Sequence, residues 1–85
     1  MQRATIYTTD YCSYCRAAKS FFTQKGIPFD EIDVTGDDAA RDDLQERTGR
    51  HTVPQIWIGG TWVGGYDDLR AAERSGKLQE LLLQG

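Results

Sequence analysis

The two cysteines of this 85-residue chain, Cys12 and Cys15, stand three residues apart in the segment YCSYC. Thiols at this spacing can form a reversible disulfide, although the same spacing also supplies half of a zinc site. A complete zinc site needs four ligands, and His51 is the single histidine that could be added. A bridge across so short a loop would add little stability. The pair therefore favours redox chemistry over a metal-binding or purely structural role.

The elements predicted around the cysteines explain how the two thiols would differ. The β-rich segment ATIYTT leads toward them, and a helix is expected from about residue 14 to residue 25, with Gly26 ending it. Cys12 then precedes the helix and Cys15 lies in its first turn, with both sulfurs on one side. The positive end of the helix favours a thiolate at Cys12. We expect Cys12 to be the nucleophile and Cys15 the resolving thiol.

The remaining segments predict one α/β domain over residues 1–85. PFDEIDV is expected to form a second strand, GDDAARDDLQERTG a helix ended by Gly49, and QIWIGGTWVGG a hairpin in which Gly59 and Gly60 supply positive φ values. A last helical stretch should begin around residues 66–68 and be interrupted at Ser75-Gly76. This order predicts a four-stranded mixed sheet flanked by helices, with a right-handed parallel crossover near its start.

Charge and hydropathy narrow the range of partners. The net charge is −3 and the isoelectric point is about 4.9, without the basic stripe that phosphate backbones attract, so no nucleic-acid partner is expected. The start of the chain lacks the apolar stretch of a secretory signal, and no apolar run is long enough to cross a bilayer. We expect no membrane partner and a cytoplasmic location, where thiols stay reduced.

Three segments together carry a family resemblance. YTTDYCSYC, TVPQIWIGG and GGYDDL occur in the order and at the separations typical of glutaredoxins, and the chain resembles the short bacterial dithiol members over nearly its whole length. The resemblance implies a thioredoxin-like fold and a glutathione-dependent reduction of protein disulfides and of protein-glutathione mixed disulfides. Its implied partners are glutathione, as co-substrate, and disulfide-containing or glutathionylated proteins, with a monomer as the expected state.

The same resemblance implies a glutathione site. A cis Pro54 would hold the TVP turn beside the thiols and present the backbone of Val53 to glutathione. The start of the last helical stretch would receive the γ-glutamyl end, since a helix N-terminus suits a carboxylate and Asp67 can accept a bond from the ammonium. Arg41 would bind the glycine carboxylate. The expected set is Tyr14, which should be partly exposed, with Arg41, Thr52, Val53, Pro54, Gly65, Tyr66 and Asp67.

Two departures from the family pattern leave alternatives open. Ser13 stands where dithiol members commonly have proline, and its hydroxyl could donate to Cys12. Some members with serine there hold a [2Fe-2S] cluster between two protomers, ligated by Cys12 of each and by two glutathiones, which would make the protein an iron-sulfur carrier or sensor. Thr9 replaces a frequent lysine, so the Cys12 thiolate should be less stabilised and Arg41 should matter more.

A third alternative concerns the electron donor. Some glutaredoxin-like redoxins accept electrons from thioredoxin reductase and serve ribonucleotide reductase, but their loop after the hairpin differs, and GGYDDL favours glutathione. His51 is interpreted as a polar loop residue, because the helix already activates the nucleophile. Trp57 and Trp62 are interpreted as packing residues of the hairpin.

Overall fold

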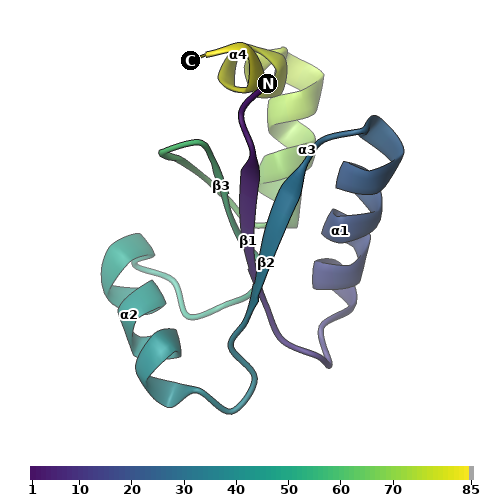
Figure 1. The fold of residues 1–85 in the computed structure, drawn as a ribbon. Coiled ribbons are helices and arrows are strands. Elements are labelled where there is room, and N and C mark those ends of the chain that lie inside the picture. Colours follow the sequence, from purple (N-terminus) through teal and green to yellow (C-terminus); the bar gives the residue numbers. More distant parts are fainter. Residues whose placement is uncertain (85) are drawn as a thin grey trace.

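The computed structural model describes residues 1–84, so the domain predicted over residues 1–85 is covered except for Gly85, which lies outside the described residues. Strands and helices follow each other in the predicted order (Figure 1). They are β1 (Ala4–Thr8), α1 (Ser13–Lys25), β2 (Phe29–Asp33), α2 (Asp38–Thr48), β3 (Gln55–Ile58), β4 (Thr61–Gly64), α3 (Tyr66–Ser75) and α4 (Lys77–Leu83). The last helical stretch is interrupted at Gly76, as expected.

The sheet is mixed, with the strand order β2-β1-β3-β4. β1 pairs in parallel with β2, so α1 forms the crossover between them, and β1 pairs antiparallel with β3, where Ile6 lies opposite Ile56. β3 and β4 form the antiparallel hairpin. In its turn only Gly59 takes a positive φ, +59°, so the prediction that Gly60 would share this conformation is wrong.

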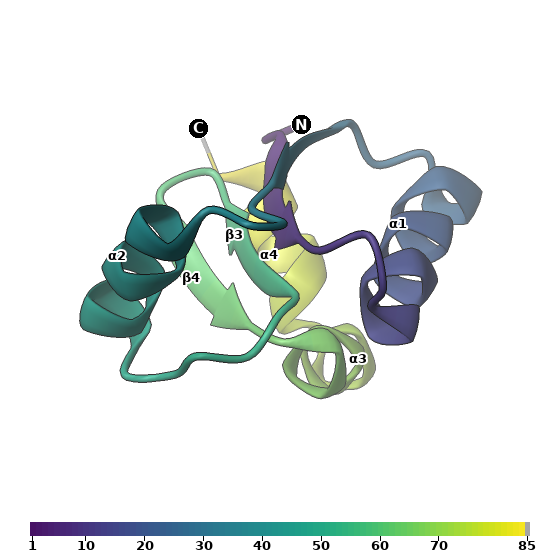
Figure 2. The same cartoon turned by 90° about the horizontal axis from the view of Figure 1, so that it is seen from below.

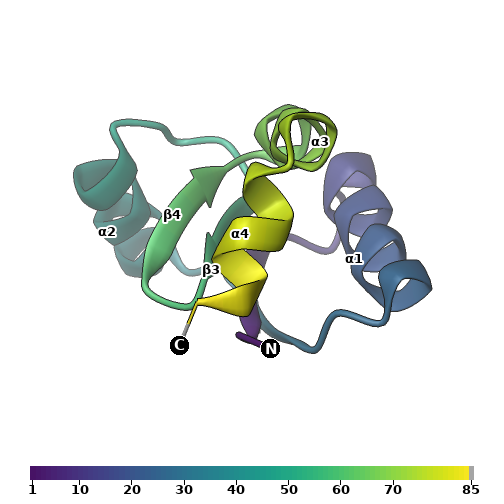
Figure 3. The same ribbon diagram turned by 90° about the horizontal axis from the view of Figure 1, so that it is seen from above.

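Helices cover both faces of the sheet. Side chains alternate along a strand, so Ile6 and Ile56 enter one face while Tyr7 and Trp57 enter the other. Figures 2 and 3 show α1 and α3 on one side of the sheet and α2 on the opposite side. Arg47 of α2 lies over the rings of Tyr7 and Trp57.

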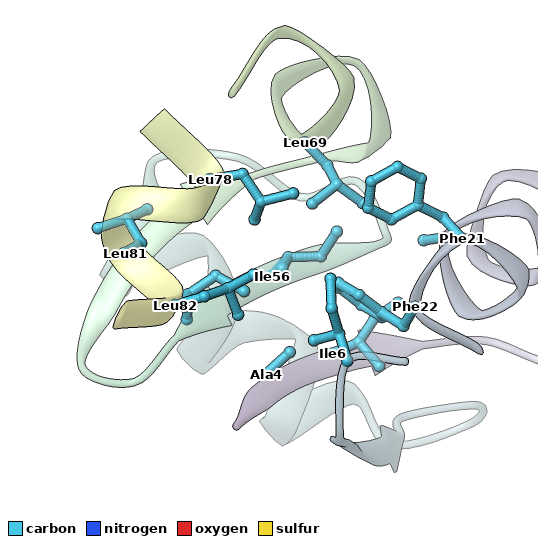
Figure 4. Close-up of a cluster of buried hydrophobic side chains, with 12 residues drawn as sticks. Ala4, Ile6, Phe21, Phe22, Ile56, Leu69, Leu78, Leu81 and Leu82 are labelled. Carbon is cyan, nitrogen blue, oxygen red and sulfur yellow. The ribbon is translucent and has the colours of Figure 1, made fainter. Parts of the chain in front are cut away.

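The hydrophobic core lies between the sheet and α1, α3 and α4 (Figure 4). Its buried members are Ala4, Ile6, Ala18, Phe21, Phe22, Ile27, Ile56, Ile58, Leu69, Leu78, Leu81 and Leu82. Leu69 fixes α3 on this core and is fully buried, so its truncation to alanine should cost about 2–5 kcal/mol. The core thereby holds the first turns of α1 and α3, where the predicted site residues lie. No helix within residues 1–84 is both long and apolar enough to cross a membrane.

Candidate active site

Cys12 ends the loop between β1 and α1 and caps the helix. Its backbone is extended, and its carbonyl accepts the first helical hydrogen bond, from the N–H of Arg16. Its sulfur accepts the N–H of Cys15 at 3.1 Å, in the manner of an N-cap side chain. The helix begins at Ser13, one residue before the predicted start. Cys12 is half-buried, and its sulfur lies at the positive end of α1.

Cys15 differs from Cys12 in exposure, and its surroundings raise its pKa. It is 1% exposed, at the inner side of the first turn of α1. Burial raises the pKa of the Cys15 thiol to about 12, and the hydrogen bond with Cys12 adds to the rise, while the backbone of Thr9 and the charge of Lys19 act against it. Cys15 is therefore a protonated thiol at neutral pH, held directly behind the sulfur of Cys12.

The TVP segment forms a wall beside Cys12. The Val53-Pro54 bond is cis, as the resemblance implies. The Cys12 thiol donates to the carbonyl of Val53 at 3.5 Å, which joins the wall to the end of α1. Gln55, fully buried, donates from Nε2 to the carbonyl of Thr52 at 3.0 Å and so fixes the other end of the segment.

A pocket of about 230 Å³ opens between this wall and the start of α3. Seven of the expected binding residues line it: Tyr14, Thr52, Val53, Pro54, Gly65, Tyr66 and Asp67. Tyr14 is 61% exposed, as expected, and its ring lies 6.0 Å from that of Tyr66. Arg41 is not among the lining residues, and its Nη2 donates to the carbonyl of His51 at 2.8 Å.

Sequence reasoning missed two charged residues of the pocket, Arg50 and Asp68. Asp68 Oδ2 accepts from Gly65 N–H at 2.9 Å and from Arg50 Nη1 at 2.7 Å. The Arg50 guanidinium and the Gly65 N–H hold the pKa of Asp68 below its usual range. Asp68 could have been found as an acidic residue at the third position of a helix, where it caps the N-terminus. Arg50 has no such local signal.

Gly64 allows the Asp68 carboxylate to lie where it does. Its φ is +119°, a value that side-chain-bearing residues rarely adopt, and a Cβ placed on it would stand 2.5 Å from Asp68 Oδ2. The absence of a side chain at Gly64 therefore allows the Asp68 carboxylate to approach the backbone of Gly64 and Gly65 at the edge of the pocket.

The two departures from the family pattern differ in exposure. Ser13 is exposed, and the hydrogen bonds of the Cys12 sulfur run to Cys15 and Val53, so the expected bond from the Ser13 hydroxyl is not formed. Thr9 is only 4% exposed, and within residues 1–84 its hydroxyl oxygen has no hydrogen-bond partner. Of the two arginines, Arg50 lines the pocket and Arg41 does not.

The two tryptophans have different surroundings. Trp57 packs edge-on against Tyr7 at 5.4 Å and under Arg47 at 4.6 Å, as a packing residue should. Trp62 is 38% exposed, lies under Arg50 at 5.1 Å, and donates from Nε1 to Gln55 Oε1 at 3.0 Å.

These contacts define what the site can do chemically. An accessible sulfur at a helix N-terminus is a nucleophile for disulfide bonds, and a buried thiol 3 residues further along can attack the mixed disulfide that forms. Within residues 1–84 no group of three or more His, Cys, Asp or Glu side chains is placed to hold a metal ion.

Comparisons with known proteins agree with this chemistry. A sequence model of the glutaredoxin family matches residues 4–63. A glutaredoxin of Pseudomonas aeruginosa is 51% identical over 82 residues, which cover 96% of this chain and 98% of the relative. The solution structure of a glutaredoxin from Brucella melitensis is 49% identical, covers 96% of this chain and 89% of that one, and superposes with a TM-score of 0.84.

A third similar protein is the buckwheat glutaredoxin in a crystal structure of its glutathione complex. It is 33% identical, with a TM-score of 0.88, and the match covers 95% of this chain and 76% of the buckwheat chain. The thioredoxin-like fold is thereby confirmed, together with the CxxC pair at its expected place. The chain belongs to the glutaredoxin family of thiol-disulfide oxidoreductases.

Proposed function

We propose that the protein uses glutathione to reduce protein disulfides and protein-glutathione mixed disulfides. The observation that carries this proposal is the pocket of about 230 Å³ that adjoins the accessible Cys12 and is lined by the TVP wall and the start of α3. A tripeptide thiol lying in this pocket would bring its sulfur to Cys12. The buckwheat relative, crystallised with glutathione, supports the same ligand class here.

The proposed ligand contacts follow from the lining residues. The backbone of Val53 pairs with the peptide backbone of glutathione, beside Thr52 and Pro54, and the ring of Tyr14 borders the cysteinyl group. The γ-glutamyl carboxylate lies at the N-terminus of α3, where Gly65 and Tyr66 begin the helix.

Both acidic residues at the start of α3 face the pocket, so the γ-glutamyl ammonium pairs with Asp67 or Asp68. Arg41 keeps its proposed role at the outer end of the site, next to Thr52. Its guanidinium is held on the carbonyl of His51, from where it receives the glycine carboxylate.

The proposed reaction uses both thiols in turn. The Cys12 thiolate attacks a substrate disulfide, forming a new S–S bond and expelling one substrate sulfur as a thiolate, which takes up a proton. Cys15 then loses its proton and attacks the Cys12 sulfur, which releases the second substrate thiol and leaves a Cys12-Cys15 disulfide. Two glutathiones reduce this disulfide and leave as glutathione disulfide, so that two electrons pass to the substrate. A glutathionylated protein requires Cys12 alone.

The test is a coupled assay with two electron donors. The protein is given a glutathionylated protein substrate, with glutathione and glutathione reductase in one series and thioredoxin reductase in the other. We expect turnover in the first series. Rapid turnover with thioredoxin reductase and none with glutathione would instead assign the protein to redoxins that supply ribonucleotide reductase.

One feature favours a second candidate function, a [2Fe-2S] cluster bridging two copies of the chain. Ser13 follows Cys12 in place of a proline, and Cys12 is the more exposed of the two cysteines. Each copy would supply the sulfur of its Cys12, and two glutathiones would supply the other ligands. Anaerobic purification with glutathione, followed by an absorption spectrum and sizing, tests it. A brown dimer supports the cluster, whereas a colourless active monomer supports the oxidoreductase alone.

The proposed setting is the cytoplasm, where glutathione and its reductase keep free thiols reduced. Both cysteines of the chain are free, and each has a role in the reaction above only if it starts reduced. Disulfide-containing and glutathionylated proteins are the proposed partners.

A further inference from the structure

Arg50 closes one side of the pocket beside Cys12. Its Nη1 lies 2.7 Å from Asp68 Oδ2, and its guanidinium lies 5.1 Å from the centroid of the Trp62 ring. The side chains of Arg50 and Asp68 are 45% and 40% exposed, and an ion pair in such surroundings adds little net stability. Arg50 can therefore exchange Asp68 for another anion at low cost.

Asp68 does not depend on Arg50 for its position. The N–H of Gly65 donates to its carboxylate at 2.9 Å, which is the capping bond of α3. This hydrogen bond joins the Gly65 N–H to the Asp68 carboxylate without involving Arg50, so it would persist if Arg50 turned away. Asp68 would then present an ionised carboxylate to the pocket, with one partner in place of two.

Trp62 is a fixed platform for the guanidinium. Its Nε1–H donates to Gln55 Oε1 at 3.0 Å, and Gln55 in turn donates to the carbonyl of Thr52 at 3.0 Å. Gln55 is fully buried, so the indole is tied to the TVP wall through a rigid link. A guanidinium can pivot across an aromatic face while it keeps its cation–π contact. The platform thus guides Arg50 without locking it onto Asp68.

We propose that Arg50 is a mobile counter-ion that makes the pocket selective for a zwitterionic amino-acid end of its ligand. The inference rests on the proposed glutathione site. In the free protein Arg50 neutralises Asp68. When the γ-glutamyl end enters, its ammonium pairs with Asp68, and Arg50 turns on Trp62 to the carboxylate attached to the same carbon. One ion pair is exchanged for two, so Arg50, Asp68 and both charges of the ligand end each have a partner.

The charges of the pocket fit this exchange. Among its lining residues within the described chain, Arg50 is the one cation, beside the two carboxylates of Asp67 and Asp68. A ligand end carrying only an ammonium would displace Arg50 and leave it unpaired. An end carrying only a carboxylate could reach Arg50 but would leave Asp68 unpaired. Both should bind less well than the zwitterion, because unpaired charges are costly in a partly desolvated pocket.

Binding of redox-inactive ligands tests the proposal. S-methylglutathione is compared by calorimetry with two S-methylated analogues, one lacking the γ-glutamyl carboxylate and one lacking the γ-glutamyl ammonium. For the wild type we expect each deletion to weaken binding about tenfold, as for one charge-assisted hydrogen bond. In Arg50→Gln the penalty for the missing carboxylate should fall to the smaller part that the N-terminus of α3 supplies, while the penalty for the missing ammonium remains. Arg50→Lys should retain part of the carboxylate penalty.

Arg47→Gln is the matched control. Arg47 also stacks on a tryptophan, Trp57, at 4.6 Å, but it does so on the face covered by α2 and does not line the pocket. In Arg47→Gln the loss of affinity for each of the two analogues should equal the loss measured with the wild type. Circular dichroism checks that every variant is folded.

The possible failures separate the inference from the function on which it rests. If Arg50→Gln binds S-methylglutathione and still shows the full tenfold penalty for the missing carboxylate, Arg50 does not read that group and the inference is overturned. If the folded wild type does not bind S-methylglutathione at all, the glutathione site itself is wrong and the inference fails with it.

Discussion

Cys12 and Cys15 are separated by two residues, yet they occupy opposite environments. Cys12 is half-buried at the helix N-terminus beside the pocket, whereas Cys15 is 1% exposed, with a pKa raised to about 12. The first turn of α1 causes the difference, because it places one sulfur in the capping position and turns the next toward the core. Two chemically identical side chains thereby become an accessible nucleophile and a protected second thiol.

Serine substitutions of the two cysteines should have the largest effects on activity, and the two variants should lose different activities. Cys12→Ser removes the nucleophile, so reduction of both glutathionylated substrates and protein disulfides should fall by at least about a thousandfold. Cys15→Ser should retain most activity on glutathionylated substrates and lose most reduction of protein disulfides. Steady-state rates with both substrate types measure this, and equal losses in the two variants would contradict the assigned roles.

Alkylation should sharpen the contrast in reactivity between the two cysteines. Because its pKa is raised to about 12, Cys15 stays a neutral thiol at pH 7, and its burial further limits access. Reduced protein treated with iodoacetamide at pH 7 should carry one label, at Cys12, by mass spectrometry of its peptides. Because a raised pKa favours the neutral thiol below it, labelling of Cys15 should rise about tenfold per pH unit toward pH 12. Equal labelling of both cysteines at pH 7 would show that Cys15 is not protected.

The smallest expected effect comes from a substitution of Thr9, whose backbone hydrogen bond opposes the rise in the pKa of Cys15. Its hydroxyl is buried without a partner in the described chain, so Thr9→Val removes an unsatisfied group and should raise the free energy of unfolding by about 1 kcal/mol in urea titrations. Labelling of Cys15 should not change, since the contact is through the backbone.

Thr8→Val is the control for this substitution. The Thr8 hydroxyl donates to Glu31 Oε2 at 2.6 Å, so its loss should lower the free energy of unfolding by about 1 kcal/mol. If Thr9→Val destabilised the protein as much as Thr8→Val, the Thr9 hydroxyl would have a partner after all.

Local signals in the sequence were enough to predict the helices and strands and a mixed sheet, whereas the strand order came from the family resemblance. Hydrophobic alternation, Gly26, Gly49 and Gly76 as helix ends, and the strand-helix-strand order lead to the observed elements within one or two residues. The position of Cys12 at a helix start is also local. The cis bond before Pro54 was accessible only through the family resemblance, because most bonds to proline in folded proteins are trans.

Contacts between distant segments could not be predicted in this way. Arg50 and Asp68 are 18 residues apart and meet because β3 and β4 fold back between them. The resemblance indicates Arg41, and only the folded chain shows that Arg50 lines the pocket while Arg41 is held on the carbonyl of His51. The burial of Thr9 likewise could not be predicted from the sequence, because it depends on the packing of the folded chain.

The two ends of the described chain lie together, far from Cys12. The N–H of Gln2 donates to the carbonyl of Leu82 at 2.8 Å, and Figure 1 shows this corner at the opposite end of β1 from the loop that leads into α1. A fluorescent protein or an affinity tag fused at either end would stand across the molecule from the thiols. The domain is therefore well suited to genetically encoded redox reporters, in which a fusion partner must leave the reactive sulfur open.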